Sequence, residues 1–150
     1  MRVEMTVNGE RKVFEADPSD TLLDVLRRNG YLSVKKGCDT GTCGVCTVLM
    51  DGVPVLSCIV LAGKAHGHEI TTVEGIENEM REFAEKLAQE GADQCGYCSP
   101  GLVVMVYALK KMYSNPTEEE IKKFLIGNLC RCSGYQGQMR AIKRFLGVGE

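Results

Sequence analysis

The chain has 150 residues, of which 44% are hydrophobic and 25% are charged, a composition typical of globular proteins. Its net charge is −2, and its lysine pairs are scattered among acidic residues, so no nucleic-acid-binding face is expected. The longest apolar run, residues 101–109, is too short to span a bilayer, and the N-terminus begins directly as a strand without leader features, so we expect a cytoplasmic protein.

The first part of the chain has the sequence pattern of β-strands. Apolar and polar residues alternate over residues 2–7, and Asn8-Gly9 is a strong hairpin signal before a second strand at residues 11–15. Further strands are expected at residues 47–50, 53–60 and 69–73. Asp51-Gly52 would turn the second hairpin, and Cys58 would lie within its return strand.

One helix is expected between the two hairpins, from Thr21 to about Asn29. Ser19 or Asp20 would be its N-cap, and Gly30 stands where a left-handed residue ends a helix. Two hairpins with one helix packed across them predict a β-grasp domain, a two-layer α+β fold.

From about residue 76 the apolar period changes to that of amphipathic helices. Ser99 is expected to cap a helix with Pro100 at its first position, and Thr117 opens a capping box. The four helices are expected around residues 80–88, 101–112, 117–125 and 139–146. The second of them is apolar almost all round, so it should be the buried centre of a bundle or face another protein. We therefore expect a first domain over residues 1–75 and an all-α four-helix-bundle domain over residues 76–150.

The eight cysteines fall into two quartets, and in the cytoplasm such a pattern favours metal binding over disulfides. The first quartet comprises Cys38, Cys43, Cys46 and Cys58. Its spacing, Cys-x4-Cys-x2-Cys with one distant cysteine, is that of plant-type [2Fe–2S] proteins. Zinc is the alternative, but structural zinc sites usually pair their ligands on two knuckles, which this glycine-rich loop does not resemble.

The second quartet comprises Cys95, Cys98, Cys130 and Cys132. By spacing alone it suits either an iron–sulfur cluster or zinc. Each of its pairs lies beside an expected helix end, so the four sulfurs could meet where two helices come together.

Three segments resemble one family in order and in detail: residues 37–48, 94–101 and 127–135. Together they resemble the small iron–sulfur subunit of the molybdenum hydroxylases, the family of xanthine dehydrogenase, aldehyde oxidoreductase and carbon monoxide dehydrogenase. The resemblance covers essentially the whole chain. It implies a plant-ferredoxin-like domain followed by a four-helix bundle, with a [2Fe–2S] cluster in each.

The resemblance also implies partners and a direction of electron flow. A large subunit would hold a molybdenum–pterin cofactor, and a medium subunit would hold FAD, in a dimer of heterotrimers. Single electrons would leave molybdenum through the cluster of the second quartet and then through that of the first, towards FAD. Gln94 and Cys132 match positions that approach the pterin in relatives, which would make them cofactor-binding residues. No catalytic residue is expected on this chain, and the substrate of the complex stays open.

Two other functions fit parts of the pattern. A free-standing two-cluster ferredoxin would carry the same cysteines, although the apolar helix at residues 101–112 argues against it. A zinc-stapled interaction module is the second alternative, and it would be colourless where iron–sulfur proteins are red-brown.

Overall fold

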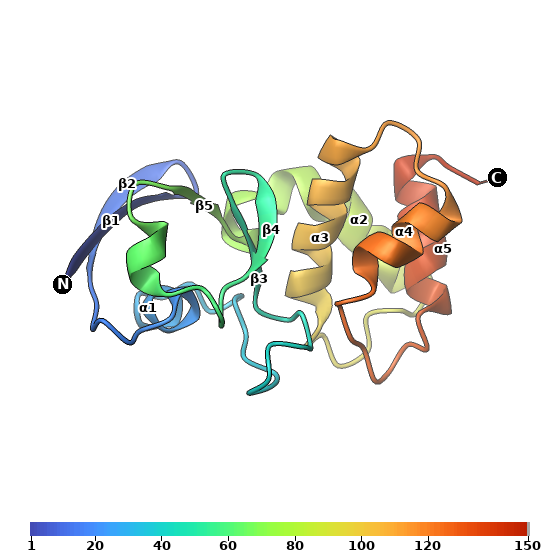
Figure 1. Ribbon diagram of the computed structural model, residues 1–150. Coiled ribbons are helices and arrows are strands. Elements are labelled where there is room, and N and C mark those ends of the chain that lie inside the picture. Colours follow the sequence, from blue (N-terminus) through green and yellow to red (C-terminus); the bar gives the residue numbers. More distant parts are fainter. Residues whose placement is uncertain (150) are drawn as a thin grey trace.

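Five strands in the first part of the chain form one mixed sheet in the order β2-β1-β5-β3-β4 (Figure 1). The computed structural model describes residues 1–149. The strands are β1 (Arg2–Val7), β2 (Glu10–Glu15), β3 (Thr47–Met50), β4 (Val53–Leu56) and β5 (Glu69–Thr71). β1 and β5 run parallel, and the other neighbours are antiparallel. With the helices described below, the predicted α+β class is confirmed.

Both predicted hairpins are present, and each turns on an Asx-Gly pair with positive φ. Asn8 and Gly9 have φ of 52° and 82°, and Asp51 and Gly52 have φ of 51° and 79°. Two successive residues of this kind give a type I′ turn, whose twist matches that of the strands it joins. The pairing of β1 with β2 sends Val3, Met5 and Val7 inward, where each is 1% exposed.

Helix α1 (Leu22–Arg28) covers one face of the sheet, and its N-cap is Thr21. Thr21 and Asp24 form a reciprocal capping box, so the prediction of Ser19 or Asp20 as cap was wrong. The carboxylate of Asp20 instead accepts a hydrogen bond from the Arg28 guanidinium at the far end of the helix. The helix ends as predicted, with Gly30 at φ 92°.

Two strands are shorter than expected. β4 ends at Leu56, because the next residues turn away and the Ile59 amide donates back to the Leu56 carbonyl at 3.1 Å. Cys58 therefore lies in a turn and not in a strand, which corrects the prediction. β5 ends at Thr71 because the chain winds into a 3-10 helix, η2 (Val73–Gly75). A further 3-10 helix, η1 (Ala62–Ala65), had no sequence prediction.

The second part of the chain contains the four expected helices. They are α2 (Glu77–Gln89), α3 (Ser99–Met112), α4 (Glu118–Leu125) and α5 (Gln136–Leu146). Thr117 caps α4 through a complete capping box, as predicted. Ser99 is not a cap, because its hydroxyl donates to Asp93 at 2.5 Å and Cys98 occupies the N-cap position. Within residues 1–149, no helix is both long and apolar enough to cross a bilayer.

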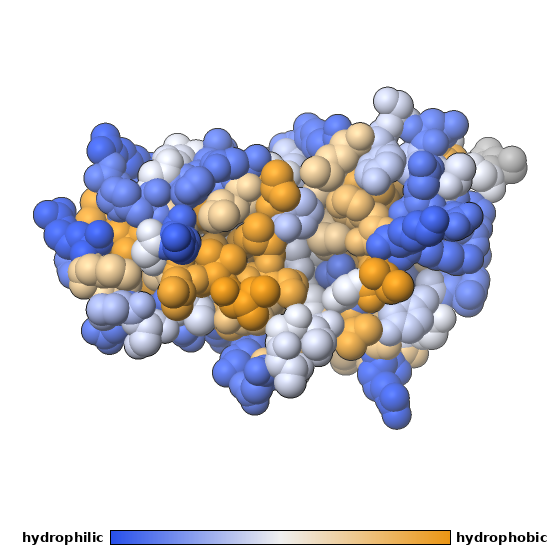
Figure 2. Space-filling view, viewed as in Figure 1, coloured by the Kyte–Doolittle hydropathy of each residue, from blue (hydrophilic) through white to orange (hydrophobic). Residues whose placement is uncertain are grey.

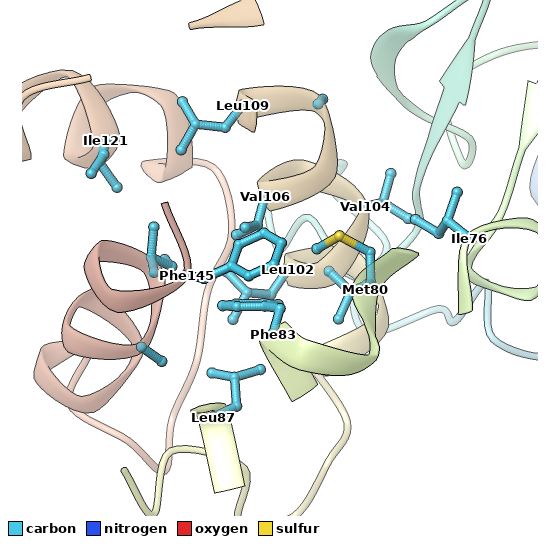
Figure 3. Close-up of a cluster of buried hydrophobic side chains, with 14 of the residues drawn as sticks. Ile76, Met80, Phe83, Leu87, Leu102, Val104, Val106, Leu109, Ile121 and Phe145 are labelled. Carbon is cyan, nitrogen blue, oxygen red and sulfur yellow. The ribbon is translucent and has the colours of Figure 1, made fainter. Parts of the chain in front are cut away.

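Helix α3 is the central element of the molecule. Seven of its residues are buried, and it packs against α2 and α4 on one side and against β3 on the other (Figure 1). Figure 3 shows the core of the helical part, where Phe83 of α2 and Phe145 of α5 lie with ring centroids 5.4 Å apart. The expectation that this apolar helix is the buried centre is confirmed, and its position brings the two cysteine-bearing regions together.

Candidate iron–sulfur sites

The first quartet gathers between α1 and the β3–β4 hairpin. Cys38 and Cys43 lie in the loop before β3, whereas Cys46 is 3% exposed and directly precedes that strand. The hairpin brings Cys58 back beside Cys46, and the Ser57 hydroxyl fixes this return by donating to the Cys46 carbonyl at 2.6 Å. The sulfurs meet as two pairs, Cys43 with Cys38 and Cys58 with Cys46.

Hydrogen bonds prepare one sulfur of this quartet to be a thiolate. The amides of Thr42, Cys43 and Thr40 lower the pKa of Cys38 to about 5, and the Thr42 nitrogen is 3.4 Å from the sulfur. Burial has the opposite effect on Cys58, whose pKa it raises to about 12. Such amide-to-sulfur bonds stabilise negative charge, which iron–sulfur ligands need.

The glycine-rich loop also makes room for the second site. Gly44 has φ of 79°, and a Cβ built on it would lie 2.3 Å from the carbonyl oxygen of Gly127. Glycines beside the cysteines leave room for a cluster close to the backbone. The structure shows that Gly44 also admits the loop that carries the second quartet, a contact that no local sequence signal reveals.

The second quartet gathers at the ends of three helices. Cys95 and Cys98 lie in the segment between α2 and α3, and Cys130 and Cys132 lie between α4 and α5. These sulfurs also meet in pairs, Cys132 with Cys95 and Cys98 with Cys130. The Tyr97 amide lowers the pKa of Cys95, whereas burial and the neighbouring Cys130 raise the pKa of Cys98 to about 11.

Two side chains that the sequence did not single out donate to these sulfurs. Ser133 donates to the Cys130 sulfur twice, from its amide at 3.4 Å and from its hydroxyl at 3.2 Å. Burial raises the pKa of Cys130, but these bonds outweigh it and leave that pKa below its ordinary value. The Gln138 amide lies 3.8 Å from the Cys98 sulfur. Gln138 is only 6% exposed, and a glutamine on the buried face of an amphipathic helix was the signal that could have found it.

Gln94 and Cys132 are brought together at the surface. The Gln94 side-chain amide donates to the Cys132 carbonyl at 3.4 Å, and Gln94, Cys95 and Cys132 are all exposed. The second site therefore has one edge open to solvent or to a partner.

The donor sets suit two-iron clusters. In the described residues all eight cysteines are free. Each quartet supplies four cysteine sulfurs, and four thiolates are the ligand set of a [2Fe–2S] cluster. The residues present therefore fit one such cluster at each quartet.

Comparison with known proteins decides the family. Residues 5–88 match the family described as a 2Fe-2S iron-sulfur cluster binding domain, and residues 72–143 match a [2Fe-2S] binding domain. The chain is 46% identical over 138 residues to the xanthine dehydrogenase iron-sulfur-binding subunit of Escherichia coli O157:H7, covering 89% of this chain and 87% of the relative. It is 42% identical over 136 residues to the nicotinate dehydrogenase small FeS subunit of Eubacterium barkeri, with the same coverage. The chain belongs to the iron–sulfur subunits of the molybdenum hydroxylase family.

A solved structure of this family has the same fold. Quinoline 2-oxidoreductase from Pseudomonas putida 86 superposes with a TM-score of 0.89 at 37% identity, over 95% of this chain and 90% of that chain. The aldehyde oxidoreductase of Desulfovibrio gigas gives 0.90 at 33% identity, but the match covers only 17% of that longer chain. The predicted iron–sulfur chemistry is confirmed: the chain is an electron-transfer subunit of an oxidoreductase with two [2Fe–2S] domains.

Proposed function

We propose that this chain passes single electrons from a molybdenum–pterin centre in a large subunit towards FAD in a medium subunit. Cys95, Cys98, Cys130 and Cys132 would hold the cluster nearer molybdenum, and Cys38, Cys43, Cys46 and Cys58 the cluster nearer FAD. Each cluster, when bound, accepts and releases one electron. The chain has no catalytic residue in this proposal. It holds both clusters close together and sets their reduction potentials.

The contact between the two cysteine loops is the observation that carries this proposal. The Leu129 amide donates to the Cys43 carbonyl at 2.9 Å, and Leu129 is bonded directly to Cys130. One hydrogen bond therefore joins the backbone of a first-quartet cysteine to the residue that directly precedes a second-quartet cysteine. Asn128 strengthens the contact by donating from its side chain to the Gly44 carbonyl at 3.2 Å.

The exposed edge of the second quartet supports the proposal that its cluster is the one nearer molybdenum. Gln94 and Cys132 both face outward there, and we propose that they bind the pterin. A side-chain amide offers both a donor and an acceptor, which suits hydrogen bonding to a pterin edge.

We place the domain boundary at residues 75 and 76, giving domains 1–75 and 76–150. Two separate hydrophobic clusters support this division, one built from residues 3–70 and the other mainly from residues 76–148. Leu49 of β3 packs with the second cluster, so the two domains share a packed boundary.

Exposed apolar side chains support a place within a larger assembly. Figure 2 shows an apolar area near the centre of the visible face, over β4 and the segment after it. Val53, Ile59 and Leu61 are 52%, 66% and 48% exposed in this region, and Ile126 after α4 is 81% exposed. Apolar areas of this kind commonly mark protein interfaces. We propose a dimer of heterotrimers in the cytoplasm, where the eight thiols stay reduced.

The test is to purify the complex from its native host under mild conditions and measure iron, molybdenum and flavin. We expect about four irons per chain with stoichiometric molybdenum and flavin. Four irons in a small monodisperse protein without molybdenum would contradict the proposal and indicate a free ferredoxin.

A variant of the complex tests the electron route separately. Cys98→Ser should abolish reduction of the natural acceptor but leave turnover with an artificial acceptor that takes electrons at molybdenum. Ser99→Ala is the matched control, because the Ser99 hydroxyl contacts Asp93 and no sulfur. Undiminished reduction of the natural acceptor in Cys98→Ser would show that electrons do not leave through this site.

A further inference from the structure

Lys35 joins the two cysteine loops across the domain boundary. Its ammonium lies 3.2 Å from the carbonyl oxygen of Gly96, which stands between Cys95 and Cys98. The same ammonium sits over the Tyr97 ring, 4.9 Å from the centroid. The side chain thus leaves the first-quartet loop and ends on the second.

Tyr97 makes the reciprocal contact. Its hydroxyl donates to the Lys36 carbonyl at 2.5 Å, and its ring lies 3.5 Å from a Cβ built on Gly37. Tyr97 is 45% exposed and belongs to neither hydrophobic core, so core packing does not account for its position. Its contacts are with the loop that begins at Lys35.

The base of Lys35 is fixed from behind. Val34 is 2% exposed, and the Arg27 guanidinium donates to the Val34 carbonyl at 2.7 Å and to the Leu32 carbonyl at 3.2 Å. The half-buried Lys35 therefore projects from an anchored backbone, and its charge has a defined place between the two sites.

The adjacent lysine differs in a way that makes the role of Lys35 specific. Lys36 is exposed and pairs with the Asp39 carboxylate at 2.7 Å, which offsets its charge. Lys35 takes part in none of the ion pairs found among residues 1–149, and its polar contact is the Gly96 carbonyl. A positive charge beside cluster ligands favours the reduced, more negative form of the cluster, and partial burial reduces screening of that charge.

We propose that Lys35 and Tyr97 form a clamp between the two cysteine loops, in which the Lys35 ammonium raises the reduction potential of the cluster held by the second quartet. Both are positioning residues, and the inference rests on the proposed ligand sets. In this arrangement Lys35 makes the second site a better electron acceptor, while Tyr97 fixes the separation of the two loops.

The test measures midpoint potentials by redox titration with electron paramagnetic resonance detection in the complete complex. Lys35→Met should shift the potential of the second-quartet cluster to a more negative value. Lys35→Arg keeps the positive charge and should leave that potential close to the wild-type value. Lys36→Met, which removes an already paired charge from the same loop, should leave that potential unchanged. Equal potentials in Lys35→Met and the wild type, or equal shifts in Lys35→Met and Lys36→Met, would overturn the proposal.

A second measurement tests the holding role of Tyr97 separately from the charge of Lys35. Tyr97→Phe keeps the ring under Lys35 but loses the hydroxyl bond to Lys36, so amide hydrogen exchange should become faster around Gly37. Unchanged exchange there would exclude a holding role for Tyr97. Failure of the ligand assignment would look different, because the wild type would then lack one cluster signal from the start.

Discussion

At the scale of single residues, Ser133 acts directly on a sulfur of the second site. Its amide and hydroxyl both donate to the Cys130 sulfur, and its oxygen accepts from the Tyr135 amide at 3.2 Å. Tyr135 has φ of 68°, a left-handed conformation that this short network stabilises. One small side chain therefore both tunes a cysteine and shapes the loop that presents it.

We expect Ser133→Ala to lower the reduction potential of the cluster at the second quartet. The change removes the hydroxyl donor, so extra negative charge on the Cys130 sulfur becomes less stable. Ser133→Thr keeps the hydroxyl and should stay close to the wild type. A redox titration in which the alanine and threonine variants agree would show that this hydrogen bond does not affect the potential.

Glu74 gives a second prediction, one that depends on pH. Burial raises its pKa, but hydrogen bonds from Ser33 and Thr72 outweigh burial and leave that pKa below the ordinary value of 4.5. A lowered folded pKa contributes stability above the unfolded pKa and loses it as pH falls through the folded pKa. We expect Glu74→Gln to cost about 1 kcal/mol near neutral pH and almost nothing in acid.

Urea unfolding of Glu74→Gln and of the wild type, from neutral to acidic pH, measures the difference in their free energies of unfolding. Acid damage to the clusters affects both proteins equally and so does not change this difference. Glu85→Gln is the control, since Glu85 is an exposed carboxylate on the neighbouring helix α2. A constant difference between Glu74→Gln and the wild type at all pH values would contradict the assigned pKa shift.

At the scale of elements, helix α3 meets the first-quartet loop backbone to backbone. A Cβ on Gly101 would lie 2.5 Å from the Gly44 carbonyl oxygen and 3.0 Å from the Val45 Cα. Neither neighbour is a flexible side-chain end that could move aside. The first turn of this helix therefore needs glycine for a tertiary reason, although alanine is the better helix former.

We expect Gly101→Ala to destabilise the protein by about 1–3 kcal/mol and to disturb both sites, because it pushes α3 away from the loop. Gly127→Ala serves as the control, since a Cβ there meets nothing within 4 Å and its φ is not positive. Thermal unfolding and the iron content of both variants test this. Equal stability of the two would show that the contact can relax at no cost.

These elements also show what sequence can and cannot predict. Thr117 was correctly predicted as a cap because a capping box is complete within four residues. Ser99 was wrongly predicted because its hydroxyl has a better partner, Asp93, outside the helix. Cysteine spacing indicated the cluster type of the first quartet, because three of its ligands lie in one short segment. For the second quartet, spacing alone left an iron–sulfur cluster and zinc open, and the resemblance of longer segments decided between them. The bonds between the loops could not be predicted, because Cys43 and Leu129 are far apart in the chain.

At the scale of the whole molecule, each quartet closes a long stretch of chain. The first joins the loop after α1 to the turn after β4, and the second joins the start of α3 to the segment between α4 and α5. The two hydrophobic cores are each small, and small domains often depend on a metal or another covalent staple. Cluster binding should therefore contribute to folding as well as to electron transfer.

We expect removal of iron under anaerobic conditions to lower the midpoint of thermal unfolding by roughly 10 °C, which corresponds to roughly 3 kcal/mol for a chain of this size. Circular dichroism of loaded and iron-free protein measures the shift.

Since Leu129 and Asn128 bind the first-quartet loop, loss of either cluster should destabilise both domains. Cys46→Ser and Cys98→Ser, which on the proposed ligand sets should each remove one cluster, separate the two contributions. If each variant destabilises only its own domain, the loops do not couple the domains; if the loaded and iron-free proteins melt together, the clusters add nothing to folding.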